Sequence, residues 1–191
     1  MKQRLRADVR AQRRNLDAAS RTRWDQLINR ETLKLVEQEC AGSLAAYLSF
    51  DGEPDLRPVL DILARRGVRI ALPLVIKEPA PGKLVFRAWT PADSLATGPF
   101  GIDQPAEGEA VRPQELELLL MPLVAWDEQG HRLGMGAGYY DRALAAWADS
   151  ESPKRIGIAY AMQKHPGLPA DPWDVGLHEV ITERGRFTCR A

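Results

Sequence analysis

Short apolar segments alternate with helical patterns along this chain, and that alternation constrains its fold more than any other feature. Residues 55–66 repeat apolar positions at helical spacing, and Gly67 is placed to end that helix. Five apolar runs have the length of buried strands: Ser43–Leu48, Val68–Leu72, Leu116–Val124, Arg155–Tyr160 and Val180–Thr182. The alternation predicts an α/β fold with three layers, α/β/α, around a mostly parallel sheet. Ligands of such folds bind at the carboxyl ends of the strands.

The start of the chain and one long loop complete the expected elements. Residues 2–15 favour a basic N-terminal helix, and Asp17 is placed to cap a second helix that runs to about Val36. Lys83–Trp89 alternates apolar and polar residues, as a half-exposed strand does. Thr90–Glu109 is rich in Pro and Gly and has no periodicity. We expect a loop there, and its length indicates a functional role.

Composition limits the class of protein. A length of 191 residues with 45% hydrophobic residues predicts a single domain over residues 1–191. Basic and acidic residues both number 26, so net charge favours neither nucleic acid nor a membrane as partner. Cys40 and Cys189 lack metal or redox spacing, which is typical of a reducing compartment. No apolar run approaches the roughly 20 residues of a spanning helix. We expect a cytoplasmic monomer.

Positive charge is concentrated at the start of the chain. Residues 1–30 contain nine basic and three acidic residues, so the remainder of the chain is net negative. A solvated helix face is the usual explanation of such charges, and an anionic partner is the alternative.

A glycine loop follows the expected strand Leu116–Val124 and precedes an expected helix, Tyr139–Trp147. Its sequence is Arg132-Leu133-Gly134-Met135-Gly136-Ala137-Gly138-Tyr139-Tyr140-Asp141-Arg142. Alternate glycines allow positive φ and let backbone N–H groups approach an anion such as phosphate. The six-residue dinucleotide fingerprint is absent, and so is the Lys-Ser or Lys-Thr of a Walker loop. A tight turn is an alternative explanation of the glycines.

The charged residues of this run strengthen the phosphate interpretation. Arginine offers fixed donors to phosphate, and Asp141 can hold a hard divalent cation. Asp141 also has a simpler explanation, because a carboxylate is favourable near the N-terminus of a helix.

The run resembles the signature of the 5-formyltetrahydrofolate cyclo-ligase family, also called methenyltetrahydrofolate synthetase. Four further segments are similar to family blocks in the same order, so the resemblance spans almost the whole chain. They are Lys2-Gln3-Arg4-Leu5-Arg6, Tyr47 to Glu53 with the strand ending Leu72-Pro73, Phe100-Gly101-Ile102-x-x-Pro105, and Pro172-Trp173-Asp174-Val175.

The resemblance implies an ATP site between the N-terminal helix and the glycine loop. Its residues would be Lys2, Arg6, Arg132, Leu133, Gly134, Met135, Gly136, Ala137, Gly138, Tyr139 and Tyr140. The family's magnesium ligands fall on Asp141 and Asp174, and Arg132 and Tyr140 are the expected catalytic residues. Without the resemblance, Asp174 would be interpreted as a turn or capping residue.

The resemblance also implies a folate site. Its residues would be Leu48, Glu53, Phe100, Met135, Gly136, Gly138 and Tyr139. Taken alone, Glu53 before Pro54 is typical of an exposed turn, and the two tyrosines are typical of core aromatics. Some relatives carry a basic residue where this chain has Met135 or Ala137, so backbone amides must bind more of the phosphate. Gln104 replaces the Glu of many relatives.

The implied reaction closes 5-formyltetrahydrofolate to 5,10-methenyltetrahydrofolate, with ATP as cosubstrate and Mg²⁺ as cofactor. The γ-phosphoryl group would activate the formyl oxygen, and N10 would then attack the formyl carbon. The sequence shows no Ser-His-Asp or Cys-His pattern, and its histidines lack zinc spacing. Two rival hypotheses keep the phosphate site: a sugar-phosphate isomerase or acyl-transfer enzyme, and a module that binds RNA through the basic N-terminus.

Overall fold

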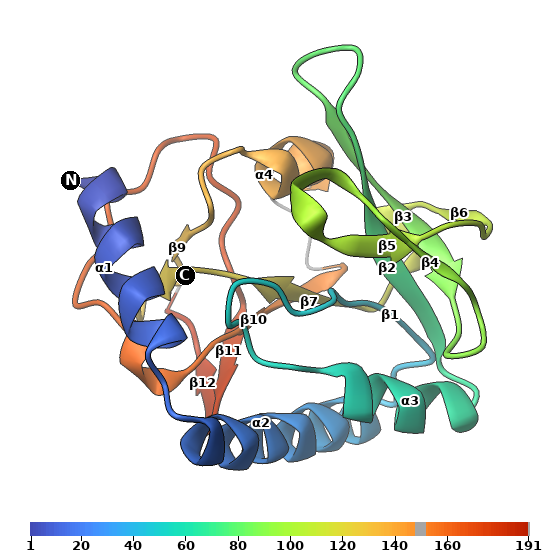
Figure 1. Ribbon diagram of the computed structural model, residues 1–191, viewed down its shortest axis with the longest axis horizontal. Helices are drawn as coiled ribbons and strands as arrows, with labels where there is room; N and C mark the ends of the chain where they lie inside the picture. The colour runs from blue at the N-terminus through green and yellow to red at the C-terminus, as the bar shows by residue number, and fades with distance from the viewer. Residues whose placement is uncertain (148–151, 191) are drawn as a thin grey trace.

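A computed structural model describes residues 1–147 and 152–190 and contains one large sheet (Figure 1). The strand order is β12-β11-β10-β7-β1-β2-β3-β6. These strands are β1 (Ser43–Ala45), β2 (Arg69–Ile76), β3 (Lys83–Trp89), β6 (Ala110–Val111), β7 (Leu118–Pro122), β10 (Lys154–Ile158), β11 (Glu179–Thr182) and β12 (Gly185–Thr188). β11, β10, β7, β1 and β2 are parallel neighbours, and antiparallel strands extend both sides. The predicted α/β class with a mostly parallel sheet is confirmed.

Alternating side chains of the central strands build a core on each face of the sheet. In β7, Leu118 and Leu120 pack beneath α2 (Ala18–Gln38) and α3 (Arg57–Arg65). Leu119 and Met121 face the other side, where α4 (Tyr139–Leu144), a 3-10 turn (Ala145–Trp147) and irregular segments cover the sheet. These are the three predicted layers. Both faces of β7 are buried, which explains its unbroken run of apolar residues.

Local signals placed several elements correctly. The Asp17 carboxylate accepts a hydrogen bond from the Ser20 N–H at 2.9 Å and caps α2, as predicted. Gly67 has φ +84° after α3, the left-handed conformation that favours glycine at a helix end. The strand Lys83–Trp89 has the predicted bounds.

The expectation of an irregular loop over Thr90–Glu109 is wrong in its central part. A hairpin forms there from β4 (Leu95–Thr97) and β5 (Asp103–Pro105), joined by a 3-10 turn (Pro99–Gly101). Three-residue strands are too short to show periodicity. Gln104 Oε1 accepts a hydrogen bond from the Val75 N–H at 3.1 Å, which attaches the hairpin to β2.

The predicted strand bounds also change at several places. β1 ends at Ala45 rather than Leu48. β2 continues past the expected end at Leu72 to Ile76, because residues 70–76 all pair with β3. Arg132 and Leu133, expected in the glycine loop, form β9 (Arg132–Leu133), which pairs with β8 (Ala125–Trp126). The antiparallel edge strand β12 was not expected.

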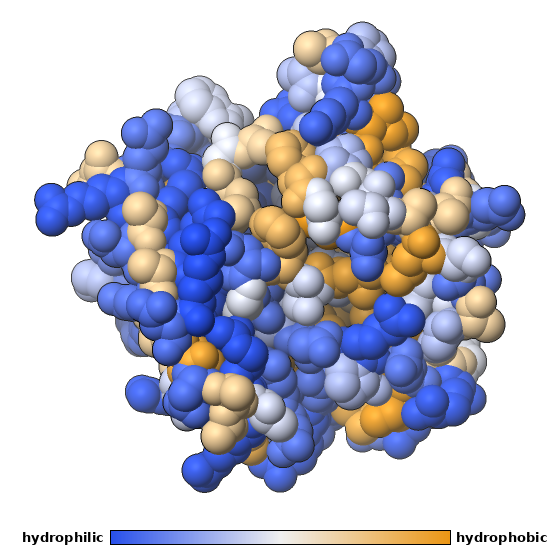
Figure 2. Space-filling view, viewed as in Figure 1, coloured by the Kyte–Doolittle hydropathy of each residue, from blue (hydrophilic) through white to orange (hydrophobic). Residues whose placement is uncertain are grey.

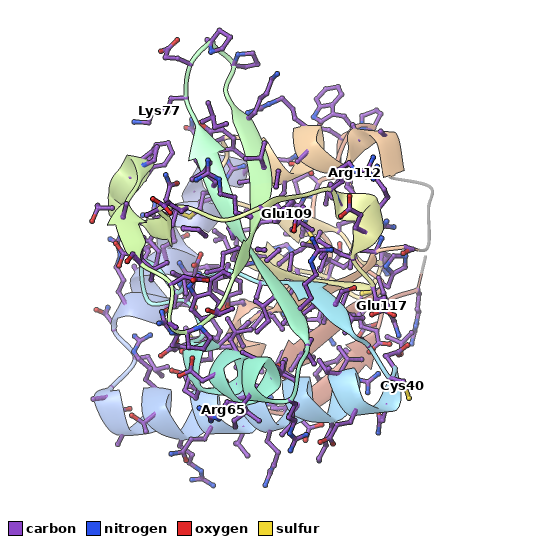
Figure 3. The ribbon with its side chains drawn as sticks, turned by 90° about the vertical axis from the view of Figure 1, so that its right-hand side faces the viewer. Cys40, Arg65, Lys77, Glu109, Arg112 and Glu117 are labelled. Atoms are coloured by element: carbon purple, nitrogen blue, oxygen red, sulfur yellow. The ribbon has the colours of Figure 1, made fainter. Side chains whose placement is uncertain are left out.

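The topology places a switch point at the centre of the sheet. From β1 the chain passes through α3 to β2, whereas from β7 it passes through α4 to β10 on the other side. The loops after β1 and β7 therefore diverge from adjacent strands, which defines a topological switch point. Figure 3 shows the β2–β3 hairpin extending past the rest of the sheet, with Lys77 near its tip. Ligand binding is expected at this switch point.

The N-terminal helix α1 (Lys2–Arg14) lies beside the sheet, away from the layer of α2 and α3 (Figure 1). Only Val9 and Arg13 of its side chains are buried. Its attachment is therefore mainly polar. Within the described residues, no helix has the length and hydrophobicity needed to cross a membrane.

Candidate active site

The glycine loop presents unoccupied backbone donors. Gly136 and Gly138 have φ of +103° and +66°, the left-handed conformations that glycine favours. Residues 135–137 are exposed. Within the described part of the chain, no N–H group of residues 134–138 donates a hydrogen bond. Adjacent free N–H groups of this kind form a concave donor set suited to phosphate oxygens.

Helix α1 brings Arg6 to this loop and Lys2 to the loop that contains Asp174. Arg6 Nε donates to the Gly134 carbonyl at 2.8 Å, and its guanidinium lies against Gly136. Lys2 Nζ contacts the carboxylates of Asp171 and Asp174 at 2.7 and 3.4 Å. The Asp171 hydrogen bond is the main reason that the pKa of Lys2 is raised. Arg6 therefore contacts the glycine loop itself, whereas Lys2 contacts the loop that contains Asp171 and Asp174.

Arg132 and Asp141 form a nearly buried ion pair beneath the loop. The Arg132 guanidinium donates to Asp141 Oδ1, and the Val175 N–H donates to the same oxygen at 3.2 Å. Arg132 Nε is buried without a partner among the described residues. An unpaired buried donor on a charged group is costly, so a bound anion would supply a missing acceptor.

The two predicted metal ligands converge on one loop. Asp141 binds the backbone of Val175, the residue after Asp174, although the two are distant in sequence. Each carboxylate already contacts a cation, Arg132 or Lys2. Among residues 1–147 and 152–190, no group of three or more His, Cys, Asp or Glu could hold a metal ion. The donor set suits Mg²⁺, which commonly takes one or two carboxylates and completes its shell with phosphate oxygens and water.

Tyr139 and Phe100 lie together on one side of the glycine loop. Their rings meet edge to face with centroids 6.4 Å apart. Lys77 lies 4.8 Å from the Phe100 ring centroid, and Arg142 lies 5.1 Å from that of Tyr139. Phe100 is 56% exposed and has φ +66°, a conformation that non-glycine residues rarely adopt. An exposed aromatic held in such a conformation is typical of a ligand-contact position.

Tyr140 lies close to Arg132 and is influenced electrostatically by Glu53 of the loop after β1. Its ring centroid lies 6.0 Å from the Arg132 guanidinium carbon. Burial raises the pKa of Tyr140 well above its ordinary value, and the nearby Glu53 carboxylate raises it further. Tyr140 therefore remains a neutral hydroxyl at physiological pH.

Glu53 is a buried acid rather than the exposed turn residue that its local sequence suggests. Its Oε2 accepts a hydrogen bond from the Phe50 N–H at 3.1 Å, and 9% of the residue is exposed. Burial raises the pKa of Glu53 to about 7, with Arg13 as the main opposing influence. Perturbed carboxylates in clefts are candidates for functional groups. Leu48, on the same loop, is half-buried against the α2–α3 core.

The remaining predicted residues fall into two groups. Met135 and Ala137 project from the exposed part of the loop. Leu133 instead packs with Ala125 and Leu168 in a small apolar cluster. The Leu133 side chain therefore faces protein rather than the open side of the loop.

Sequence reasoning missed a cluster of charges beneath this site. Asp51 is 4% exposed by its side chain, and the guanidinium groups of Arg10, Arg13 and Arg14 all bind it. The basic excess at the N-terminus is therefore partly neutralised inside the protein. Arginines at helical spacing were a visible signal, but their partner lies about 40 residues away.

The face that holds these groups is hollowed between α1 and the β2–β3 hairpin. Figure 2 shows a hydrophilic surface over α1 and hydrophobic side chains gathered in and beside the depression. A polar wall facing an apolar wall suits a ligand with a charged part and an aromatic part.

Fold and site together define an α/β protein with a basic, exposed glycine loop at the switch point of its sheet. A family model described as the 5-formyltetrahydrofolate cyclo-ligase family matches residues 1–183. The chain is 35% identical over 182 residues to the 5-formyltetrahydrofolate cyclo-ligase of Haemophilus influenzae, covering 94% of this chain and 96% of that protein. It is 39% identical over 144 residues to the 5-formyltetrahydrofolate cyclo-ligase of Escherichia coli K12, covering 74% of this chain and 78% of that protein.

Solved structures agree with this assignment. The NMR structure of Aquifex aeolicus 5,10-methenyltetrahydrofolate synthetase matches with a TM-score of 0.83 and 32% identity, covering 100% of this chain and 93% of that one. The synthetase of Mycoplasma pneumoniae matches with a TM-score of 0.77 and 28% identity, over 95% and 98% of the chains. This chain belongs to the 5-formyltetrahydrofolate cyclo-ligase family and is a ligase.

Proposed function

We propose that this chain uses ATP and Mg²⁺ to close 5-formyltetrahydrofolate to 5,10-methenyltetrahydrofolate, releasing ADP and phosphate. The observation that carries the proposal is the position of the glycine loop. Its free N–H groups lie beside Arg6 of α1, and the helix that follows the loop begins with Tyr139 and Tyr140, the second of which has its pKa raised by Glu53. This arrangement supports a phosphate site beside a separate organic substrate.

The chemistry explains why a phosphoryl donor is needed. Nitrogen donates electrons into the carbonyl of a formamide, which makes the formyl carbon a poor electrophile. Transfer of the γ-phosphoryl group to the formyl oxygen converts that oxygen into a leaving group. N10 then attacks the formyl carbon and loses its proton, the five-membered ring closes, and the C–O bond breaks as phosphate departs.

The phosphate side of the site would be formed by α1 and the glycine loop. Lys2, Arg6 and the loop N–H groups would hold the ATP phosphates, and Arg132 would stabilise charge on the transferring group. Because Met135 and Ala137 are uncharged, backbone donors carry most of this binding. Asp141 and Asp174 would hold Mg²⁺, which neutralises phosphate charge when bound.

The folate side would be formed by the loop after β1 and by Phe100. Glu53 can accept hydrogen bonds from the donor edge of the pterin, and Leu48 and Phe100 offer apolar contact. The neutral Tyr140 hydroxyl lies between the two substrates and can donate a hydrogen bond to the reacting oxygen. Holding N10 near the activated carbon supplies proximity, and no covalent nucleophile is required.

The proposal is tested by mixing protein with 5-formyltetrahydrofolate and MgATP and following the absorbance of the methenyl product, with a chelator control. Asp141→Asn and Arg132→Ala should lower kcat at least about a hundredfold, the usual cost of losing an electrostatic contact in the transition state. Asp8→Asn is the control, because Asp8 is exposed on α1 and its one ion pair within the described part of the chain is with Arg4. Wild-type turnover in either site variant would refute the assignment, and no ATP-dependent product would refute the function.

A further inference from the structure

The segment Asp51–Gly52–Glu53 has an uncommon backbone that arginines hold in place. Asp51 and Gly52 have φ of +54° and +75°, and the left-handed conformation is unfavourable for Asp51. Arg13 Nε donates to the Asp51 carbonyl at 3.0 Å, and the Arg21 guanidinium donates to the Gly52 carbonyl at 2.8 Å. Both left-handed residues therefore have carbonyls bound to arginine immediately before Glu53.

Arg13 is fully buried and joins three parts of the site. Besides the Asp51 carbonyl, its guanidinium donates to Asp51 Oδ2 and to the Leu123 carbonyl, each at 3.2 Å. Asp51 lies in the loop after β1, and Leu123 directly follows β7. One side chain of α1 therefore fixes both loops that leave the switch point.

Glu53 is left with capacity for further hydrogen bonds. An ionised carboxylate has about four acceptor positions, and among the described residues the Glu53 carboxylate accepts one hydrogen bond, from the Phe50 N–H. Among residues 1–147 and 152–190, the ion-pair partner of Glu53 is Arg13, whose guanidinium nitrogen lies 3.9 Å from Glu53 Oε1. That separation allows attraction but no hydrogen bond, so Arg13 orients the carboxylate without using its acceptors.

We infer that Arg13 is a positioning residue that holds Glu53 oriented toward folate, and that Asp51 in turn holds Arg13. The inference rests on the proposed function, because the place of folate at Glu53 is itself proposed. Arg13 shares α1 with Lys2 and Arg6, so the helix that supplies phosphate ligands also orders the folate acid. Arg10 and Arg13 lower the pKa of Glu53, and Asp51 raises it. Glu53 in turn raises the pKa of Tyr47 and of Tyr140.

A double-mutant cycle separates positioning from general stability. Arg13→Gln should raise the KM for folate about tenfold or more, the scale of a lost charged contact, and leave the KM for ATP within about twofold. Glu53→Gln should raise the folate KM similarly. In the Glu53→Gln background, Arg13→Gln should add less than about twofold, because its effect passes through Glu53. If the double variant raised the folate KM by the product of the two single effects, the inference would be overturned.

Arg14→Gln is the matched control. Arg14 binds the same Asp51 from the next position of the helix but makes no contact with Glu53. Its folate KM should stay within about twofold of the wild type, and a change equal to that of Arg13→Gln would refute the inference. If Arg13→Gln does not fold, Asp51→Asn replaces it in the cycle with the same expected pattern.

A second measurement does not depend on turnover. The Glu53 carboxyl carbon is followed by ¹³C NMR across pH and assigned by its loss in Glu53→Gln. Arg13→Gln should raise the pKa of Glu53, and Arg14→Gln should change it less. No rise in Arg13→Gln would overturn the inference even if the wild type formed no methenyl product, so this failure is distinct from failure of the proposed function.

Discussion

Glu53 should destabilise the free protein at neutral and alkaline pH. Burial raises its pKa from 4.5 to about 7. Each pKa unit corresponds to about 1.36 kcal/mol, so the difference amounts to about 3 kcal/mol. Between pH 4.5 and 7 the folded protein binds more protons than the unfolded chain. The contribution of Glu53 to the free energy of unfolding therefore falls as pH rises through this window.

Glu53→Gln removes the titrating group and keeps an oxygen that can accept from the Phe50 N–H. At pH 8 the variant should exceed the wild type in unfolding free energy by up to about 3 kcal/mol. For a chain of this size that is roughly 6–12 °C in Tm. Near pH 4.5 the two proteins should be nearly equal in stability. Thermal unfolding followed by circular dichroism from pH 4.5 to 8.5 measures the difference.

The control for this experiment is Glu107→Gln, in an exposed glutamate without an ion pair among the described residues. Its effect on Tm should not change across the same pH range. A Glu53→Gln variant that is less stable than the wild type at pH 8, or a difference that stays constant with pH, would refute the argument. If Glu53→Gln is more stable than the wild type but binds folate poorly, the wild-type glutamate lowers stability in exchange for folate binding.

Two further predictions concern backbone conformation. Gly130→Ala should lower the free energy of unfolding by at least about 2 kcal/mol, because its Cβ would lie 2.5 Å from the Leu177 carbonyl oxygen at φ +83°. Gly67 has φ +84° and open space around it, so Gly67→Ala should lower the free energy of unfolding by only about 1 kcal/mol. Denaturant unfolding compares the two variants, and equal losses of stability would refute the steric argument. Phe100→Gly should relieve about 1 kcal/mol of backbone strain and raise the KM for folate, and an unchanged KM would exclude contact.

Elements defined by local signals could be predicted from the sequence. The Asp17 cap, the helix end at Gly67 and the alternating strand Lys83–Trp89 depend on residues within a few positions of one another. β8 and β9 have two residues each, and their pairing depends on tertiary contacts. The buried Asp127 carboxylate, for example, accepts hydrogen bonds from His131 and from the distant Leu168 N–H.

The candidate site also divides into a part that the local sequence identifies and a part that depends on tertiary contacts. The glycine loop and Arg132 are continuous in sequence and could be identified as a candidate phosphate site. The burial of Glu53 could not be predicted from the sequence, because it depends on α1 and its buried Arg13 packing over the loop after β1. Likewise, the convergence of Asp141 on the loop of Asp174 follows from a hydrogen bond to Val175 that spans 34 positions.

Oxygen transfer tests the central claim most directly. 5-Formyltetrahydrofolate labelled with ¹⁸O in the formyl group is converted with MgATP in unlabelled water, and the released phosphate is analysed by mass spectrometry. The account predicts one ¹⁸O atom in the phosphate for each methenyl product, because the formyl oxygen accepts the γ-phosphoryl group and leaves with it. Methenyl product accompanied by unlabelled phosphate would contradict it.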